Sequence, residues 1–226
     1  MTSLYNKLNK YKLSDVIDFE KKDLQFVALN NLFKNLNDKD IFFGLILLNS
    51  IVCYQLSSTG EKYWAEFSLY FSHIRNLDKT NLVNGFKDFL KTSKGNSRLY
   101  DIKIKRIDKI NLFLSEFIIN LDYYLVNLYE LRDKIAFFMN QKNTDKTIVF
   151  SIKMIMYGAL IVYGEIQDIS HKKINIPIDS RLTKIFEKYK GDYNDINLFY
   201  CDLSKKLNIA ELHLDALIWV NYDSLI

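Results

Sequence analysis

Apolar residues recur at intervals of three and four along almost the whole chain, which is the spacing of amphipathic helices. This pattern predicts helices joined by short polar connectors, and the longest connector, at 167–178, holds the only proline. We therefore expect an all-α protein with two helical lobes, formed by a chain that passes back and forth between them. The expected helices are 14–36, 40–56, 60–74, 81–91, 98–121, 124–139, 144–164, 179–190, 195–207 and 210–220.

The composition agrees with a packed helical protein. The chain has 226 residues, of which 49% are hydrophobic and 15% aromatic, so it is long and apolar enough to bury a core. Its seven glycines and one proline are few for strands and hairpins. Cys53 and Cys201 both fall in helical patterns, which disfavours a disulfide framework and a cysteine-rich metal or iron–sulfur site. We expect no metal and no cofactor.

Two further features bear on location and partners. The N-terminal stretch MTSLYNKLNKYKL lacks the apolar run of a signal peptide. The most hydrophobic stretch, 41–52, is too short to span a bilayer, which takes about 20 residues. We therefore expect a cytoplasmic protein without a membrane partner. The formal net charge of +4 permits an anionic partner without requiring one.

The stretch NTDKTIVFSIKMIMYGAL (143–160) has the pattern of one helix with a lysine near its start. Asn143 or Thr144 would cap it, which puts Lys146 in the first turn, where the helix dipole disfavours a cation by about 0.3–1 kcal/mol. The rest is apolar nearly all round, so we expect a buried helix. Lys146 is then either a surface residue or a nucleophile, because burial and the helix dipole lower the pKa of a lysine. Lys153 is explained most simply as a snorkelling side chain.

Acidic residues near the C-terminus have both a structural and a chemical interpretation. Asp179 follows the only proline and starts a predicted helix, so it is either an N-cap or a carboxylate held at the edge of a site. Asp215 and Trp219 are four residues apart and share one helical face. They are either ordinary packing or an acceptor beside a flat ring, which is what a purine pocket needs.

Basic residues are concentrated between Lys91 and Lys109. This run is either a solvated helix face or a surface that contacts phosphates, for which Lys103, Lys105 and Arg106 are the candidate contacts to a DNA backbone. The sequence has no glycine-rich phosphate loop, no HExxH and no Ser-His-Asp signature. Composition and spacing alone therefore lead to an all-helical protein with one unusually placed lysine.

Five segments, taken in order, resemble the archaeal 8-oxoguanine DNA glycosylases, a divergent branch of the helix-hairpin-helix glycosylase superfamily. The segments are FEKKDLQF (19–26), LNSIVCYQLSSTGEKYWAEFSLYFS (48–72), DKTIVFSIKMIMY (145–157), INIPIDSRL (174–182) and LHLDALIW (212–219). They are spread over most of the chain with gaps that suit the family. The resemblance implies a bifunctional DNA glycosylase and lyase, which removes 8-oxoguanine through a lysine imine and cuts the strand by β-elimination. Its partner would be single- or double-stranded DNA containing 8-oxoguanine.

The resemblance also assigns roles to residues. Lys146 matches the family's nucleophilic lysine, which opens a helix and is followed by Thr-hydrophobic-Val-Phe. Asp179 matches the essential aspartate, within Ile-Pro-hydrophobic-Asp. The positions that match the base pocket are Gln25, Trp64, Phe150, Asp215 and Trp219. The turn before Lys146, with Asn143 and Thr144, matches the hairpin that grips the DNA backbone.

On this resemblance, residues 1–226 form one helical glycosylase unit of two intertwined lobes, with a helix-hairpin-helix at about 124–164 and the active site in the cleft between the lobes. We expect a monomer that associates with the nucleoid while acting on DNA. The chain departs from the wider superfamily in two ways: the turn NQKNTDK (140–146) has no glycine, and the chain cannot hold a four-cysteine iron–sulfur cluster. The alternative is a non-enzymatic helical nucleic-acid-binding or scaffold protein, in which Lys146 and Asp179 are a surface charge and a helix cap.

Overall fold

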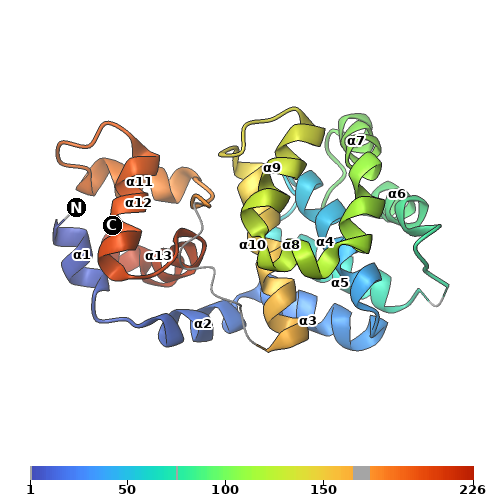
Figure 1. Ribbon diagram of the computed structural model, residues 1–226, viewed down its shortest axis with the longest axis horizontal. Coiled ribbons are helices and arrows are strands. Elements are labelled where there is room, and N and C mark those ends of the chain that lie inside the picture. The colour runs from blue at the N-terminus through green and yellow to red at the C-terminus, as the bar shows by residue number, and fades with distance from the viewer. Residues whose placement is uncertain (1, 75, 165–173) are drawn as a thin grey trace. The chain divides into compact units, whose positions relative to one another are not determined.

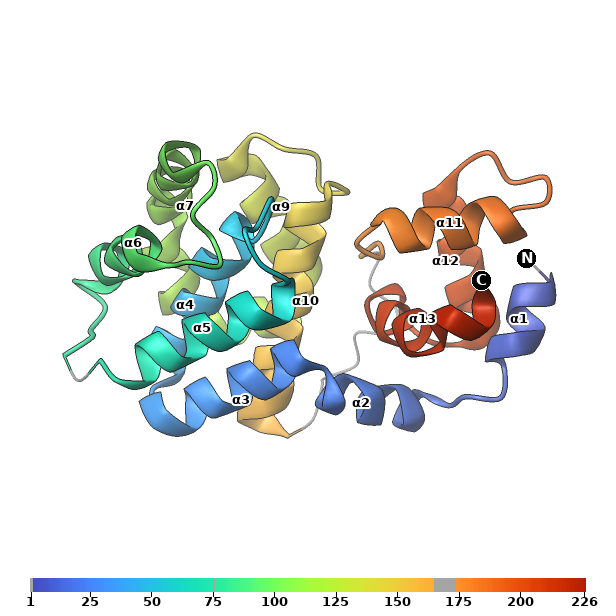
Figure 2. The same cartoon turned by 180° about the vertical axis from the view of Figure 1, so that it is seen from behind.

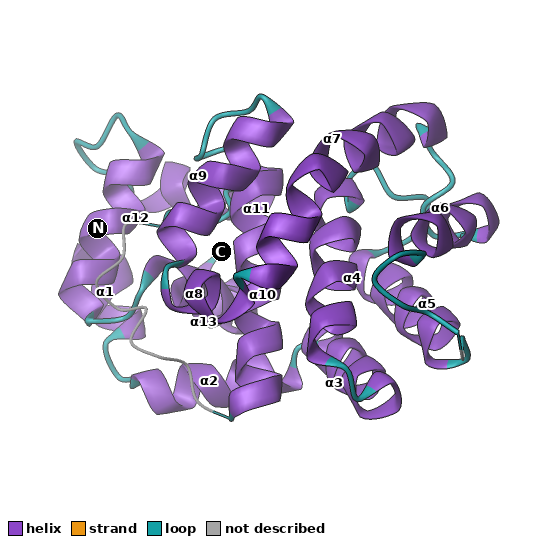
Figure 3. Ribbon diagram, turned by 45° about the vertical axis from the view of Figure 1, so that its right-hand side comes forward, coloured by secondary structure: helices purple, strands orange, loops and turns teal. Residues whose placement is uncertain are grey.

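The computed structural model describes residues 2–74, 76–164 and 174–226, and the regular secondary structure in these ranges is entirely helical (Figures 1 and 3). This confirms the expected all-α fold class. The helices are α1 (Thr2–Leu8), α2 (Leu13–Lys22), α3 (Leu24–Leu36), α4 (Lys39–Val52), α5 (Gly60–Ser72), α6 (Leu82–Thr92), α7 (Tyr100–Ile119), α8 (Leu121–Val126), α9 (Leu128–Met139), α10 (Lys146–Tyr163), α11 (Ser180–Tyr189), α12 (Ile196–Leu207) and α13 (Glu211–Leu225). Most of the connector expected at 167–178 lies outside the described residues.

The described residues form two compact units, and the chain leaves the first unit and later returns to it. The first unit contains residues 2–23 and 174–226, with α1, α2 and α11–α13. The second unit contains residues 24–74 and 76–164, with α3–α10. The cleft between two lobes and the helix-hairpin-helix at 124–164 stay predictions.

Single polar residues divide two of the expected helices. The helix expected at 14–36 breaks at Asp23, whose ψ of 127° leaves the helical region, so α2 and α3 are separate. The helix expected at 124–139 breaks at Asn127, whose Nδ2 donates to the carbonyl oxygen of Tyr123 at 2.9 Å. Asp and Asn side chains compete with the backbone for helical hydrogen bonds, which favours such breaks. The short helix α1 was not among the expected elements.

In the second unit, α10 packs against α3, α4 and α9 (Figures 1 and 2). Gly158 permits the close approach of α4, because a Cβ atom there would lie 2.7 Å from Ile46 Cδ1 and 2.8 Å from Phe43 Cε1. The 18 residues of α10 have a mean hydropathy of 1.5, enough by length and composition to cross a membrane, but 61% of them are buried inside the protein. Such burial is typical of a core helix and confirms the expectation that this helix is buried.

The first unit has a core of its own, to which all five of its helices contribute. Buried polar contacts also connect these helices. The hydroxyl of Tyr200 on α12 donates to the carbonyl oxygen of Leu182 on α11 at 2.6 Å. The ring Nδ1 of His213 on α13 lies 2.9 Å from Glu20 Oε1 on α2. The positions of α11 and α13, which carry the acidic candidates, are therefore fixed by packing within one unit.

Candidate active site

Lys146 is the first residue of α10, and the residue before it, Asp145, is the N-cap. This corrects the expected cap at Asn143 or Thr144. Asp145 does not cap through its side chain; instead its Oδ2 accepts from the Lys142 backbone N–H at 3.2 Å and shapes the turn. Lys146 itself is exposed, although the helix behind it is buried. The sequence thus predicted the place of the lysine on the helix correctly, and its exposure agrees with the expectation of a surface residue in the first turn; its role as nucleophile stays a prediction.

Aromatic side chains lie close to this end of α10. Trp64 on α5 is fully buried and makes an edge-on contact with Phe150, with 6.3 Å between the ring centroids. The indole N–H of Trp64 has no hydrogen-bond partner in the described part of the chain. Phe150 lies one turn after Lys146 on the same helix. The structure therefore places the lysine, a ring and a buried N–H donor in one region of the second unit.

Cys53, the residue that ends α4, shares this region. Burial raises the pKa of its thiol to about 12, although the nearby Trp64 N–H and the charges of Lys103 and Lys146 act in the opposite direction. A thiol with such a pKa is not ionised at neutral pH and is a poor nucleophile. Cys53 is therefore not a candidate nucleophile at neutral pH.

Gln25 reaches the same region from α3. Its Nε2 lies 3.1 Å from the point that a Cβ of Gly60 would occupy, so the missing side chain at the start of α5 leaves room for the amide. Trp64 follows Gly60 by one helical turn. Gln25 is partly buried and takes part in contacts of its own. The second unit thus brings together four of the expected site residues: Gln25, Trp64, Lys146 and Phe150.

The turn between α9 and α10 is supported by Arg106. Its Nε donates to the carbonyl oxygen of Ile51 at 3.0 Å and its Nη2 donates to Gln141 Oε1 at 2.8 Å. The guanidinium also lies over the ring of Tyr54, 5.3 Å from the centroid. These contacts assign Arg106 to holding the turn before Lys146, which disagrees with its expected role as a direct phosphate contact.

Lys103 also differs from expectation. Its side chain is fully buried, donates to Asn96 Oδ1 and lies 5.1 Å from the centroid of the Tyr54 ring. Burial lowers the pKa of Lys103 to about 8. A buried ammonium cannot reach a phosphate, so the expected backbone contact is wrong for this residue.

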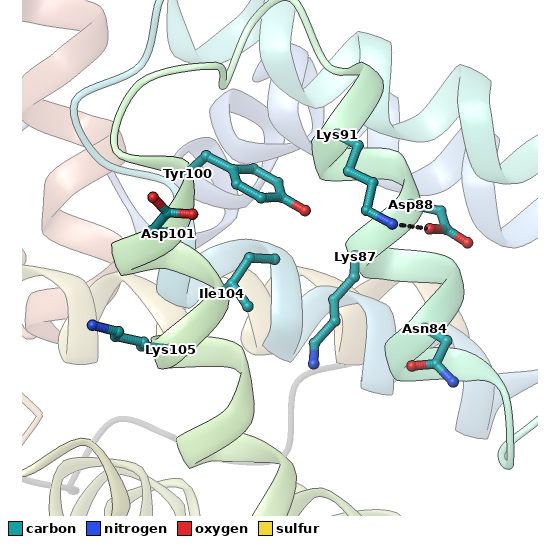
Figure 4. A pocket seen from close by; sticks show the side chains of 8 residues that line it. All are labelled: Asn84, Lys87, Asp88, Lys91, Tyr100, Asp101, Ile104 and Lys105. Carbon is teal, nitrogen blue, oxygen red and sulfur yellow. Dashed lines mark hydrogen bonds and ion pairs between the residues drawn. The ribbon is translucent and has the colours of Figure 1, made fainter.

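Lys105 is exposed, as a phosphate contact requires. It lines a groove between α6 and α7 together with Lys87 and Lys91 (Figure 4). Lys91 pairs with Asp88 at 3.0 Å, and Lys87 pairs with Asp108 at 2.5 Å. Part of the basic run is therefore a solvated face with its own ion pairs, as in the simpler of the two interpretations.

The two turn residues expected at the DNA backbone are both exposed. Thr144 lies at the surface of the α9–α10 turn. Asn143 is exposed as well, and its Nδ2 donates to Asp133 Oδ1 on α9 at 3.2 Å. Their exposure is compatible with the expected backbone contacts, which stay predictions.

In the first unit, Asp179 uses both carboxylate oxygens. As N-cap of α11 it accepts with Oδ1 from the backbone N–H groups of Arg181, at 2.9 Å, and Leu182, at 3.0 Å. Its Oδ2 accepts from Arg181 Nε at 3.2 Å and Nη2 at 3.1 Å. Asp179 is therefore a helix cap, and it also carries an ion pair that the sequence did not predict.

Asp215 and Trp219 lie on α13, as expected. Trp219 is 47% exposed, which is unusual for the largest side chain, and the guanidinium carbon of Arg181 lies 3.1 Å from its ring centroid. Asp215 is partly buried. Burial and the charges of Asp179 and Asp215 raise the pKa of Tyr200, so both carboxylates act on one buried hydroxyl.

Comparison with known proteins bears on what these residues do. The family model described as AGOG, N-glycosylase/DNA lyase, matches residues 6–225. The N-glycosylase/DNA lyase of Methanococcus maripaludis is 39% identical over 201 residues, which cover 88% of this chain and 78% of that protein. The chain belongs to the AGOG family. This confirms the expected family and the expected class of enzyme, a DNA glycosylase and lyase, over the non-enzymatic alternative.

Other AGOG proteins show the same likeness. The N-glycosylase/DNA lyase of Thermococcus kodakarensis is 38% identical over 202 residues, covering 88% of this chain and 75% of that protein. The crystal structure of an 8-oxoguanine DNA glycosylase from Pyrobaculum aerophilum, complexed with 8-oxoguanosine, superposes with a TM-score of 0.81. It is 23% identical, and the match covers 97% of this chain and 86% of that one, which shows a shared fold.

In this AGOG chain, sequence reasoning missed three residues of the candidate site. Arg181 and Glu211 act on the segment around Asp179, the first through the ion pair and the second by accepting the Ile176 N–H at 3.2 Å. The third is Cys53, which lies beside Trp64. A signal existed only for Arg181, because an arginine two residues after an N-cap aspartate is placed to bond it.

Proposed function

We propose that this chain excises 8-oxoguanine from DNA and then cleaves the strand, with Lys146 as nucleophile. The observation that carries the proposal is the position of Lys146: an exposed amine at the first residue of a core helix, in the region of Trp64 and Phe150. Family membership supports the reaction class, and the 8-oxoguanosine bound to the related Pyrobaculum enzyme supports the base.

The chemistry follows from an amine at this position. The neutral amine of Lys146 attacks the sugar carbon C1′, the bond from C1′ to the base breaks, and the base leaves with the bonding electron pair and takes up a proton. Loss of a proton from the amine and opening of the sugar ring leave an imine. The imine acidifies the hydrogen on C2′, so its removal expels the 3′ phosphate by β-elimination. The carboxylate of Asp179 stabilises the positive charge on the sugar and moves protons.

The base must leave the helical stack before it can react, at a cost of a few kcal/mol. Phe150 and Trp219 are the stacking surfaces in our proposal, and each such stack contributes about 1–3 kcal/mol. Asp215 accepts from the N1–H and the exocyclic amine that guanine and 8-oxoguanine share. Gln25 and the Trp64 N–H read the N7–H and O8 that only the lesion carries. The Trp64 donor is buried and, in the described part of the chain, has only the weak acceptor Cys53 beside it, which supports this role.

Borohydride trapping on an oligonucleotide containing 8-oxoguanine tests the proposal, because reduction of the imine leaves a covalent protein–DNA adduct. The unchanged protein should form the adduct, and Lys146→Gln should abolish it. Lys142→Gln is the matched control, since Lys142 is an exposed lysine of the same turn. Lys153→Gln should also leave trapping intact. Adduct formation at the normal rate by Lys146→Gln would refute the assignment.

The strandedness of the DNA and the oligomeric state belong to the same proposal. We propose that a monomer acts on duplex or single-stranded DNA. Trapping with both substrates, and sedimentation of the free protein and of the reduced adduct, test these points. A stable dimer in both states would contradict the monomer.

A further inference from the structure

The side chain of Arg181 covers one face of the Trp219 ring, and Trp219 is the more exposed of the two tryptophans. Its guanidinium carbon lies 3.1 Å from the Trp219 ring centroid, within stacking distance. The Nε and Nη2 groups, at the edge of the guanidinium plane, bond Asp179 Oδ2 at 3.2 and 3.1 Å. Asp179 is in turn fixed by two backbone N–H groups of α11. The positive charge is therefore held next to the ring by a chain of contacts within the first unit.

This arrangement has a consequence for the base that stacks on Trp219. One face of the ring is covered by the guanidinium, so a base has the opposite face. The face of an indole attracts cations through its ring quadrupole, which makes a bare tryptophan a good site for a positively charged base. A cation bound on one face already makes the cation–π interaction with the ring, and it repels a second positive charge on the other face.

We propose that Arg181 is a specificity-determining residue, which disfavours cationic N-alkylated purines on Trp219 and leaves neutral oxidised purines accepted. The inference rests on the proposed function, because it takes Trp219 as the stacking surface. It goes further by naming a class of damaged base that the site rejects and the residue responsible. Asp179 partly compensates the charge, but it bonds the guanidinium edge, whereas the ring meets the guanidinium face.

The test compares two nucleosides, 8-oxoguanosine, which is neutral, and 7-methylguanosine, which is cationic at pH 6. Binding of each is measured by calorimetry at pH 6. Arg181→Met keeps an apolar chain of similar length and removes the charge. The ratio of the dissociation constant of 7-methylguanosine to that of 8-oxoguanosine should therefore fall about three- to tenfold. Arg181→Lys keeps the charge and should retain most of the preference. Lys184→Met, which removes an exposed charge from the same helix, should leave the preference unchanged.

The outcomes separate the alternatives. If Arg181 only supports the Trp219 ring, Arg181→Met weakens the binding of both nucleosides equally. If Arg181 competes with the base for one face, the same change strengthens the binding of both equally. In either case the ratio of the two dissociation constants is unchanged, which overturns the proposal. Failure of the unchanged protein to bind 8-oxoguanosine contradicts the base pocket itself, and the selectivity proposal falls with it.

A second measurement needs no base. The chain has two tryptophans, of which Trp64 is fully buried and Trp219 is 47% exposed, so collisional quenching reports Trp219. Arg181→Met should increase quenching by caesium ions more than quenching by neutral acrylamide, and Arg181→Lys should not. Equal increases with both quenchers would show that Arg181 shields the ring by its bulk alone, against the proposal. Together with trapping through Lys146, which does not involve Arg181, this distinguishes failure of the inference from failure of the proposed function.

Discussion

Replacing Glu211 with glutamine should stabilise the protein above pH 7 and have little effect near pH 4.5. Glu211 is the first residue of α13 and is 8% exposed. Burial raises the pKa of its carboxyl to about 7, against the hydrogen bonds from Ile176 and Cys201 and the charge of Lys205, which all lower it. Folding therefore removes water from the Glu211 carboxylate, which disfavours its charged form.

The pH dependence follows from the two pKa values. The unfolded chain has the ordinary value of 4.5, so between pH 4.5 and about 7 the folded protein binds more protons than the unfolded chain. The free energy of unfolding must then decrease as the pH rises through this window, and level off above it. At 1.36 kcal/mol for each pKa unit, the full decrease is about 3 kcal/mol. Glutamine resembles the protonated acid, keeps an oxygen that accepts from the Ile176 N–H, and does not titrate.

Urea unfolding of both proteins at pH 5, 6, 7 and 8 measures the difference. The advantage of Glu211→Gln should grow across this range to an upper limit of about 3 kcal/mol. Glu187→Gln provides the control, because Glu187 is exposed on α11 of the same unit and pairs with Lys190 at the surface. A difference between Glu211→Gln and the unchanged protein that stays constant from pH 5 to pH 8 would refute the reasoning.

Three other changes give sharp outcomes. Asp179→Asn should keep the fold, since Asn caps helices about as well as Asp, while excision of 8-oxoguanine in a single-turnover assay falls by orders of magnitude; near-normal excision would remove Asp179 from the mechanism. Gly158→Ala should destabilise the protein by about 1–3 kcal/mol in urea unfolding, because its Cβ would lie 2.7 Å from an α4 side chain; unchanged stability would mean that α4 moves aside freely. Lys105→Gln should weaken duplex binding and reduce the slope of log affinity against log salt by about 1, whereas Lys103→Met should leave that slope unchanged; the reverse result would contradict the burial of Lys103.

The helices could be predicted from the sequence because the apolar spacing of 3.6 residues is repeated over several turns in nearly all of them. The pattern did not show the breaks at Asp23 and Asn127, because each is a single residue and the apolar spacing continues on both sides of it. The helix α1 was missed for a related reason. With only seven residues it offers too few turns for periodicity to be recognised.

The number of basic residues between Lys91 and Lys109 does not show which of them are buried. Lys103 lies on the same helical stripe as the buried Ile107, Ile110 and Leu114, at intervals of four, three and four residues. Its inward direction was therefore readable from spacing. The direction of Arg106 was not, because its acceptors are the carbonyl oxygen of Ile51 and the side chain of Gln141, which are brought near only by the tertiary fold.

The contacts of Asp179 decide how its two roles can be told apart. Its Oδ1 is engaged by backbone N–H groups and its Oδ2 by Arg181. In Asp179→Asn an amide oxygen can still cap α11, but an NH₂ group then faces the donors of the guanidinium, so the change removes both the negative charge and the anchor of Arg181. Comparison with Arg181→Met separates these effects, because that variant removes the anchored cation and keeps the carboxylate. If Asp179 stabilises charge on the sugar, excision should be lost in Asp179→Asn and largely kept in Arg181→Met. If the carboxylate acts only by holding Arg181 on Trp219, the two variants should lose excision equally, and the direct role would be refuted.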